Sequence, residues 1–278
     1  MTEGSAVIVQ FLDEYERIAD RVNKSLREYL GDPGTSQTQN LRASVRRLDA
    51  AMRLLPKRTK KEKTVKRCRE RCAELLKETS RIRDIDIQQE RMLTRSADPT
   101  VRVISENLRE ERGEYVDRSV RAAWKLFERR PPKLGKKDLP RFGRRVESVL
   151  LDLEDEIASE LSASLADEAN VEDLHSLRKH CKRLRYTLEL FRSGENQSQL
   201  IPLMRSWQDI LGEIRDMDVI IDYLSRAKQT AGVRSILAAE RASRHSRYVA
   251  FEKLCRREPL TGAHPFLRVN APRAVAAR

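Results

Sequence analysis

The spacing of apolar residues predicts a chain that is almost wholly helical. Apolar side chains recur three and four residues apart over long stretches, which is the pattern of helices that bury one face. Prolines and glycines gather in a few places, whereas an all-β chain would need a turn signal about every ten residues. The predicted helices cover about residues 6–30, 38–55, 59–78, 140–166, 171–191, 197–211, 215–228 and 232–257, with others ending near 95 and near 130.

One of these stretches, Val171 to Phe191, is apolar on one side and strongly cationic on the other. At 3.6 residues per turn, one stripe carries Leu174, Leu177, Cys181, Leu184, Leu188 and Phe191. The opposite half carries His175, Arg178, Lys179, Lys182, Arg183, Arg185 and Tyr186. For a single helix, a charged face of this kind is usually a solvated surface.

A second copy of the basic pattern changes that interpretation. Residues 41–55 align with residues 177–191, so that Leu41, Arg42, Arg46, Arg47 and Leu48 match Leu177, Arg178, Lys182, Arg183 and Leu184. An Arg-Asp-x-Asp element follows each copy, at Arg83–Asp86 and at Arg215–Asp218. From Arg42 to Arg83 the distance is 41 residues, and from Arg178 to Arg215 it is 37. Two motifs in one order at nearly one spacing indicate an internal duplication.

The duplication predicts an all-α fold of two similar half-bundles, each of four or five helices, related by an approximate two-fold. The repeats would span about residues 6–130 and 138–258 of one domain covering 1–258, joined at the Pro- and Lys-rich residues 131–140. We expect residues 259–278 to form a poorly ordered tail. The two basic helices would face each other across one central groove, where the field of both is focused.

Composition points to an anionic partner. The chain has 278 residues, a net charge of +13 and 36% charged residues, while aromatic residues make up only 5% and give little support to base stacking. Neither a secretory signal nor an apolar run of roughly 20 residues is evident, so we expect a soluble, cytoplasmic protein. Its four cysteines, Cys68, Cys72, Cys181 and Cys255, fit reduced thiols better than a disulfide framework.

The duplicated motif resembles the CHAD domain, the conserved histidine α-helical domain. The second copy, His175-Ser-Leu-Arg178-Lys-His-Cys-Lys182-Arg183-Leu184-Arg185, is close to the family pattern. The first copy is degenerate, because Gln39 stands at the place of the histidine and Asp49 at that of an arginine. The resemblance covers about residues 6–257. It implies two four-helix bundles around a basic central cavity, and binding of inorganic polyphosphate, in some members at polyphosphate granules.

Polyphosphate offers charged oxygens and no bases, so its complement is a ladder of Arg and Lys on one side of a helix. We therefore expect the polyphosphate-binding residues to be Gln39, Arg42, Arg46, Arg47, Lys66, Arg83, His175, Arg178, Lys179, Lys182, Arg183, Arg185, Tyr186 and Arg215. His175 can donate one hydrogen bond when neutral, and a nearby phosphate would favour its charged form. Gln39 can donate a hydrogen bond but cannot become charged.

Several charged residues also have structural interpretations. Asp49 and Arg53, like Arg185 and Glu189, are four apart and can pair on their own helix. In the Arg-Asp-x-Asp elements the acids can cap helices or form ion pairs between helices, while the arginines can join the basic groove. We expect a mixture of these roles. The lysines of residues 57–66 can extend the binding surface or simply be solvated.

The sequence leaves two alternative functions open. One is a helical protein that binds nucleic-acid backbone without reading its sequence. The other is a polyphosphate hydrolase that holds Mg²⁺ on the paired acids, although no third ligand or base is evident. His175 and His180 point apart on their helix, and Cys68 and Cys72 lack a matching second pair. We therefore expect a binding protein that has no catalytic residues, no metal site and no cofactor.

Overall fold

The computed structural model describes residues 3–93, 99–191 and 195–258, and within these ranges helices are the only regular secondary structure. The predicted tail at 259–278 lies outside the described residues. The helices are α1 (Glu3–Gly31), α2 (Thr35–Leu54), α3 (Lys57–Lys61), α4 (Lys63–Leu93), α5 (Pro99–Phe127), α6 (Phe142–Ala166), α7 (Val171–Leu188), α8 (Glu195–Arg226) and α9 (Ala231–Arg257), with a 3-10 turn, η1, at Lys136–Asp138. This confirms the all-α fold class that periodicity predicted.

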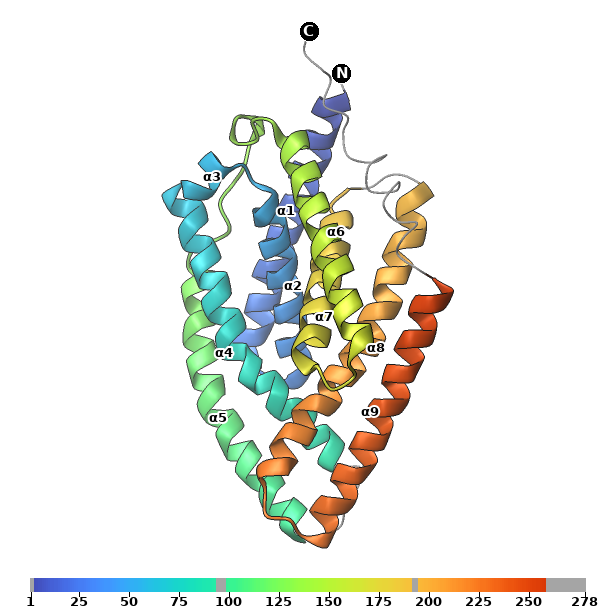
Figure 1. Cartoon of the computed structure of the whole chain (residues 1–278). Helices are drawn as coiled ribbons and strands as arrows, with labels where there is room; N and C mark the ends of the chain where they lie inside the picture. Colours follow the sequence, from blue (N-terminus) through green and yellow to red (C-terminus); the bar gives the residue numbers. More distant parts are fainter. Residues whose placement is uncertain (1–2, 94–98, 192–194, 259–278) are drawn as a thin grey trace.

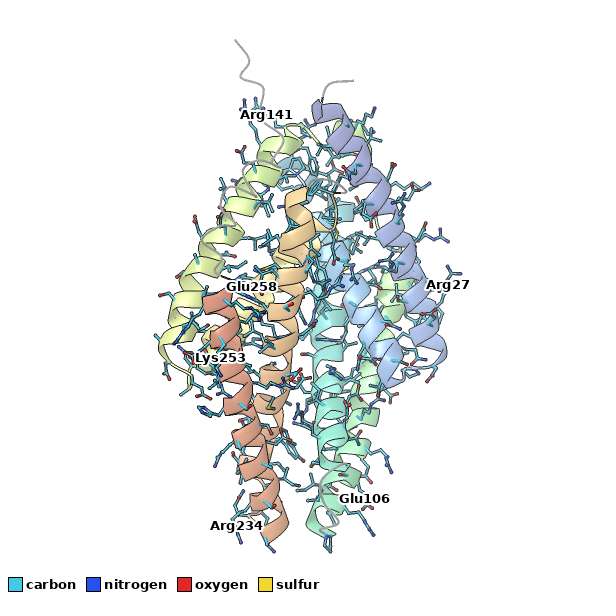
Figure 2. The ribbon with its side chains drawn as sticks, turned by 90° about the vertical axis from the view of Figure 1, so that its right-hand side faces the viewer. Arg27, Glu106, Arg141, Arg234, Lys253 and Glu258 are labelled. Carbon is cyan, nitrogen blue, oxygen red and sulfur yellow. The ribbon has the colours of Figure 1, made fainter. Side chains whose placement is uncertain are left out.

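Helices that follow one another in the chain pack side by side (Figure 1). In the first half α1 packs on α2, α2 on α4 and α4 on α5, and in the second half α6, α7, α8 and α9 pack in chain order. Between the halves, α2 contacts α6 and α7, and α4 contacts α8. The molecule tapers toward the N-terminal ends of α5 and α9, near Glu106 and Arg234. Arg141 lies at the opposite end (Figure 2). The two-fold relation of the halves stays a prediction.

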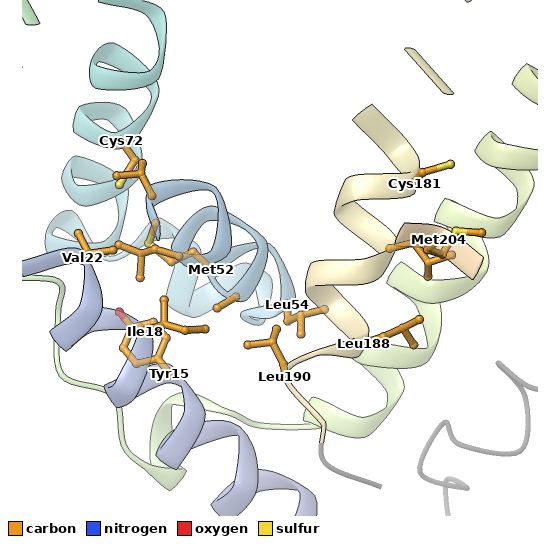
Figure 3. Packing of buried hydrophobic residues seen from close by; sticks show 14 of the residues in the cluster. Tyr15, Ile18, Val22, Met52, Leu54, Cys72, Cys181, Leu188, Leu190 and Met204 are labelled. Carbon is orange, nitrogen blue, oxygen red and sulfur yellow. The ribbon is translucent and has the colours of Figure 1, made fainter. Parts of the chain in front are cut away.

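The core extends through both halves. Its main cluster contains fully buried side chains such as Phe11 of α1, Met52 of α2, Cys181 of α7 and Trp207 of α8. Figure 3 shows part of this packing around Met52 and Cys181. A second cluster occupies the tapered end, where Ile85 of α4 belongs to the same group as apolar residues of α5, α8 and α9. Burial of these stripes, rather than helix propensity alone, holds the long helices together.

Local signals set several helix boundaries. The Asn170 side chain caps α7 by accepting a hydrogen bond from the Asp173 amide, and Thr230 caps α9 in the same way from Val233. The linker after α5 is held to the first half, because the Tyr15 hydroxyl donates to the Pro132 carbonyl at 3.0 Å. All four cysteines are buried free thiols, which agrees with the expected reduced state. None of the described helices is long and apolar enough to cross a membrane.

The predicted helix breaks beside the two Arg-Asp-x-Asp elements are wrong. α4 runs unbroken from Lys63 to Leu93 and α8 from Glu195 to Arg226, so both elements lie in helix interiors. Their acids therefore cannot cap a helix N-terminus. Gly212 lies inside α8, where an interior glycine costs only about 1 kcal/mol, which the packing of neighbouring buried residues outweighs. α7 ends at Leu188, three residues before the predicted end.

Candidate anion-binding cavity

A cavity of about 390 Å³ lies where α2, α4, α7 and α8 meet. Its lining includes seven Arg and Lys side chains and two Asp side chains. It brings together ten of the fourteen residues expected at the site, namely Gln39, Arg42, Arg46, Arg83, His175, Arg178, Lys179, Lys182, Tyr186 and Arg215. The sequence analysis did not select the other lining residues, Ala43, Ser80, Asp84, Ile87, Gly212 and Asp216, as binding residues.

Buried leucines orient the two basic helices toward the cavity. On α2, Leu41 and Leu48 are fully buried, so the residues at the opposite helical positions face the interface with α7. On α7, Leu177 and Leu184 are buried in the same way. The spacing of three and four residues then stacks successive cations one turn apart along one side of each helix.

α4 and α8 add an arginine and an aspartate each. Arg83 and Asp84 of α4 line the cavity together with Arg215 and Asp216 of α8. Their helices bury Ile82, Ile85, Ile214 and Met217 on the other side. Arg83 donates to Asp216 at 3.4 Å, a long ion pair that connects α4 to α8.

Arg42 is fixed by its own protein. Its Nη1 donates to the Leu76 carbonyl at 2.8 Å and to the Thr79 hydroxyl at 2.7 Å, both on α4. The residue is only 7% exposed. Burial, together with the charge of Arg46, lowers the pKa of Arg42 to about 9. Arg42 is therefore a structural anchor between α2 and α4 as well as a charge at the cavity wall.

Other cations of the cavity lack such anchors. Among the described residues, no hydrogen bond or ion pair engages the side chain of Arg46, Arg178 or Lys182. Three buried nitrogen atoms of the cavity have no hydrogen-bond partner: the Nε of Arg178, the Nη1 of Arg83 and the Nδ1 of His175. A buried donor without a partner is costly, so an anion that accepts from these groups would relieve the cost.

The electrostatic strain appears in the pKa values. Burial, and after it neighbouring cations such as Arg46, together lower the pKa of Lys182 to about 7 and that of Arg178 to about 10. Burial also lowers the pKa of Arg46. The nearby carboxylate of Asp216 raises the pKa of Arg178 and of Lys182, and that of Asp84 raises the pKa of Arg178, but by less than burial and the cations lower them. The free protein therefore keeps more positive charge here than its own acids neutralise.

His175 is neutral in the free protein. Burial is the largest cause, and Arg178 and Arg215 add to it, so that the pKa of His175 falls to about 3. At neutral pH the ring therefore contributes a hydrogen-bonding group without a charge. A phosphate beside the ring would act in the opposite direction and favour protonation.

The two cavity acids are also perturbed. Burial raises the pKa of Asp84 and of Asp216, and this effect outweighs the neighbouring arginines that lower it. In the parts of the chain that the structure describes, no group of three or more His, Cys, Asp or Glu residues is arranged to hold a metal ion. Both carboxylates stand among arginines, and Asp216 accepts a hydrogen bond from Arg83.

Four expected binding residues lie outside the cavity. Arg47 pairs with Glu189 at 3.4 Å, and its guanidinium lies 4.9 Å from the centre of the Tyr186 ring. Arg185 pairs with the same Glu189 and also donates to Gln208 at 3.0 Å. Lys66 is exposed near Glu70, and Arg183 lies near Arg53 and Asp49. The expected pairs within one helix, Asp49–Arg53 and Arg185–Glu189, are both confirmed.

The second acid of each Arg-Asp-x-Asp element has a structural role. Asp86 accepts from Arg112 of α5 at 2.7 Å, and Asp218 accepts from Arg244 of α9 at 2.5 Å. These arginines were missed by the sequence analysis. Each stands 26 residues after its aspartate, a shared separation that could have identified them. Within each element, one acid therefore faces the cavity and the other fastens the helix to its neighbour.

Comparisons with known proteins agree with this architecture. The CHAD domain family model matches residues 16–225. The crystal structure of the CHAD domain from the plant Ricinus communis is similar, with a TM-score of 0.62 and 15% identity, over 89% of this chain and 91% of that chain. PptA from Streptomyces chartreusis is similar with a TM-score of 0.57 and 15% identity, over 89% of this chain and 98% of that one.

No curated protein matches the chain in sequence. At 15% identity the two solved structures indicate a common fold and carry no site residues across. The family match is the stronger result, because it covers well over half of the chain and includes both basic motifs and both Arg-Asp-x-Asp elements. The chain belongs to the CHAD domain family.

Proposed function

We propose that this protein binds inorganic polyphosphate in the cavity between α2, α4, α7 and α8, and that it does so without chemical turnover. The observation that carries the proposal is the excess of cations: seven Arg and Lys side chains against two Asp. Several of these cations have no partner among the described side chains. The known link between the CHAD family and polyphosphate supports the same ligand.

The chemistry of the cavity suits a phosphate chain better than a nucleic acid. Arginine guanidinium groups can donate two parallel hydrogen bonds to phosphate oxygens, and Lys182 supplies a compact charge. Tyr186 is the one Phe, Trp or Tyr side chain among the residues that line the cavity, so successive bases would find little to stack on. In the free protein the two aspartates partly neutralise the charge of the cations. A bound polyanion would take over this role.

The central test replaces two cations that have no partner and leaves the anchoring Arg42 in place. In the double variant Arg46→Gln with Arg178→Gln we expect affinity for long-chain polyphosphate to fall at least about a hundredfold, because each lost charge-assisted hydrogen bond is worth roughly tenfold or more. Isothermal titration calorimetry gives the affinity, and circular dichroism checks that helicity is retained. The matched control is Arg241→Gln with Lys253→Gln, which removes two exposed cations from α9. If both double variants lose affinity equally, the cavity is not the site.

Competition and turnover assays separate the alternatives. Polyphosphate should displace RNA or DNA at moderate salt, and nucleic acid should fail to displace polyphosphate. Equal competition in both directions would favour a general backbone binder. Release of phosphate in the presence of Mg²⁺ that disappears in Asp84→Ala or Asp216→Ala would instead indicate a hydrolase, since both acids line the cavity.

A further inference from the structure

A second group of cations gathers away from the cavity. It comprises Arg53 of α2, Lys60 of α3, Arg69 of α4, Arg145 of α6 and Arg183 of α7, and we call it the upper cation cluster. None of the five is among the residues that line the cavity. The cluster joins the consecutive helices α2, α3 and α4 to α6 and α7, which come much later in the chain, so no local motif contains all of it.

The cluster has few internal partners. Arg53 pairs with Asp49 at 2.8 Å, and Arg145 donates to the Arg53 carbonyl at 3.5 Å. Among the described residues, the side chains of Lys60, Arg69 and Arg183 make no hydrogen bond or ion pair. The Nε atoms of Arg69 and Arg145 are buried and unpartnered. A buried donor without an acceptor destabilises the folded protein, and a bound anion that accepts a hydrogen bond from it would remove this penalty.

Two members of the cluster, Lys60 and Arg183, are close enough to other cluster cations for their pKa values to change. Burial and the charges of Arg145, Arg69 and Arg53 together lower the pKa of Lys60 to about 8. Burial also lowers the pKa of Arg183, with Arg53 as the next cause. Glu156 and Glu160 oppose this effect on Arg183, but both also contact His180, at 3.1 Å and 2.6 Å. Cations therefore remain in excess around Asp49.

The aligned position on α7 lacks this excess. There Glu189 accepts from both Arg185 and Arg47, and Arg185 also donates to Gln208. Charges at that end of α7 are thus paired within the protein. By contrast, the α2 end, where Asp49 and Arg53 stand in place of Arg185 and Glu189, has beside it several described cations whose side chains lack partners.

α2 connects the cluster to the cavity. Arg42, Arg46, Asp49 and Arg53 fall within about 60° of one another around the helix, and the rise from Arg42 to Arg53 is about 16 Å. A flexible phosphate chain that leaves the cavity along this side of α2 would therefore meet Arg53 and its neighbours. Asp49 is the only acid on that stripe, and it is already paired with Arg53.

We propose that the upper cation cluster is a second anion-binding site, which holds a further stretch of the same polyphosphate chain that occupies the cavity. This inference rests on the proposed function of the cavity. It assigns Arg183 to the second site rather than to the cavity. It also implies that affinity depends on chain length, because only a long polymer can contact both groups of cations at once.

The experiment compares tripolyphosphate with long-chain polyphosphate in two independent double variants, Lys60→Gln with Arg145→Gln and Arg69→Gln with Arg183→Gln. We expect each to lower affinity for the long chain about tenfold and to leave affinity for tripolyphosphate unchanged. The α9 variant Arg241→Gln with Lys253→Gln controls for net charge. Unchanged tripolyphosphate binding also shows that the variants are folded.

Each other outcome overturns the inference. Wild-type affinity for the long chain would mean that the cluster does not contact the polymer. A loss no larger than that of the α9 control would be an effect of net charge alone, and an equal loss for both ligands would make the cluster part of the cavity site. Failure of the proposed function looks different: tripolyphosphate would then bind the Arg46→Gln, Arg178→Gln variant as tightly as the wild type.

Discussion

Single residues show why the cavity keeps a net positive charge in the free protein. Arg42 is anchored by two acceptors of α4, whereas Arg178 and Lys182 are buried among other cations without such acceptors, and burial lowers the pKa of all three. The lowered pKa values express the free energy that the folded protein spends on holding these charges together. An anion that restores the charged forms recovers part of that free energy, so binding and protonation are coupled.

This coupling predicts a pH dependence of affinity. In the free protein Lys182 has a pKa of about 7, and a bound polyanion raises it, so the complex binds more protons than the free protein above that pH. Affinity for polyphosphate should therefore fall as pH rises from about 7 to about 9, and should fall less in Lys182→Gln, which has no proton to take up. Calorimetry at the two pH values, in buffers of different ionisation enthalpy, measures both the affinity and the proton uptake.

The comparison between wild type and variant cancels the titration of the ligand itself, which is common to both. Equal pH slopes for the two proteins would show that Lys182 does not change its charge on binding. A steeper slope in the variant would contradict the assignment of Lys182 to the site altogether.

At the scale of helices, α4 and α8 each place one acid in the cavity and one against a neighbouring helix. The alternation follows from helical geometry, because residues two apart point about 160° away from each other. Asp216 thus faces the cavity while Asp218, only 8% exposed, meets Arg244 of α9. A continuous helix through the element is what makes this division possible.

The buried pair predicts a stability effect separate from binding. Removing one partner leaves an uncompensated buried charge, so Arg244→Ala should lower the free energy of unfolding by about 3 kcal/mol or more. The exposed pair Arg226–Asp222 offers a matched control, and Arg226→Ala should cost less than about 1 kcal/mol. Urea denaturation followed by circular dichroism measures both. Similar small losses in the two variants would mean that the α8–α9 pair does not support the fold.

At the scale of the whole molecule, ion pairs cross between the halves. Arg83 of α4 meets Asp216 of α8, Arg91 of α4 meets the fully buried Glu240 of α9, and Arg47 of α2 meets Glu189. Together with the shared apolar core, these contacts set the position of α2 relative to α7 and so the width of the cavity. The net charge of +13 surrounds this site with a positive field.

The field and the number of cavity cations predict a steep dependence on salt. By analogy with nucleic-acid backbones, polyphosphate affinity should fall at least about a hundredfold between about 50 and about 200 mM salt, because binding releases counterions from the polymer. Titrations at four or more salt concentrations give the slope of log affinity against log salt. The slope should be smaller in Arg46→Gln with Arg178→Gln than in the wild type, and an unchanged slope would mean that neither charge meets the polymer.

Sequence alone determined the helical fold, the basic stripes and most of the cavity wall. Apolar spacing marks a buried face wherever a helix forms, and the repeated motif marks Arg42, Arg46, Arg178 and Lys182 as one set. Those signals are local or depend on comparing two parts of the chain, so they need no knowledge of packing. For the same reason ten of the fourteen expected binding residues line one cavity.

Only the tertiary structure decided which cationic side chains are left unpaired and available to an anion. Glu189 engages Arg47 from a helix more than 140 residues away in the chain, Arg42 is anchored by α4, and Arg112 and Arg244 take the second acids. Gly212 sits within a continuous helix because packing on both sides outweighs its weak propensity. Helical periodicity records which side of a helix is buried, but the partner that a charged side chain meets depends on long-range packing, which no local pattern contains.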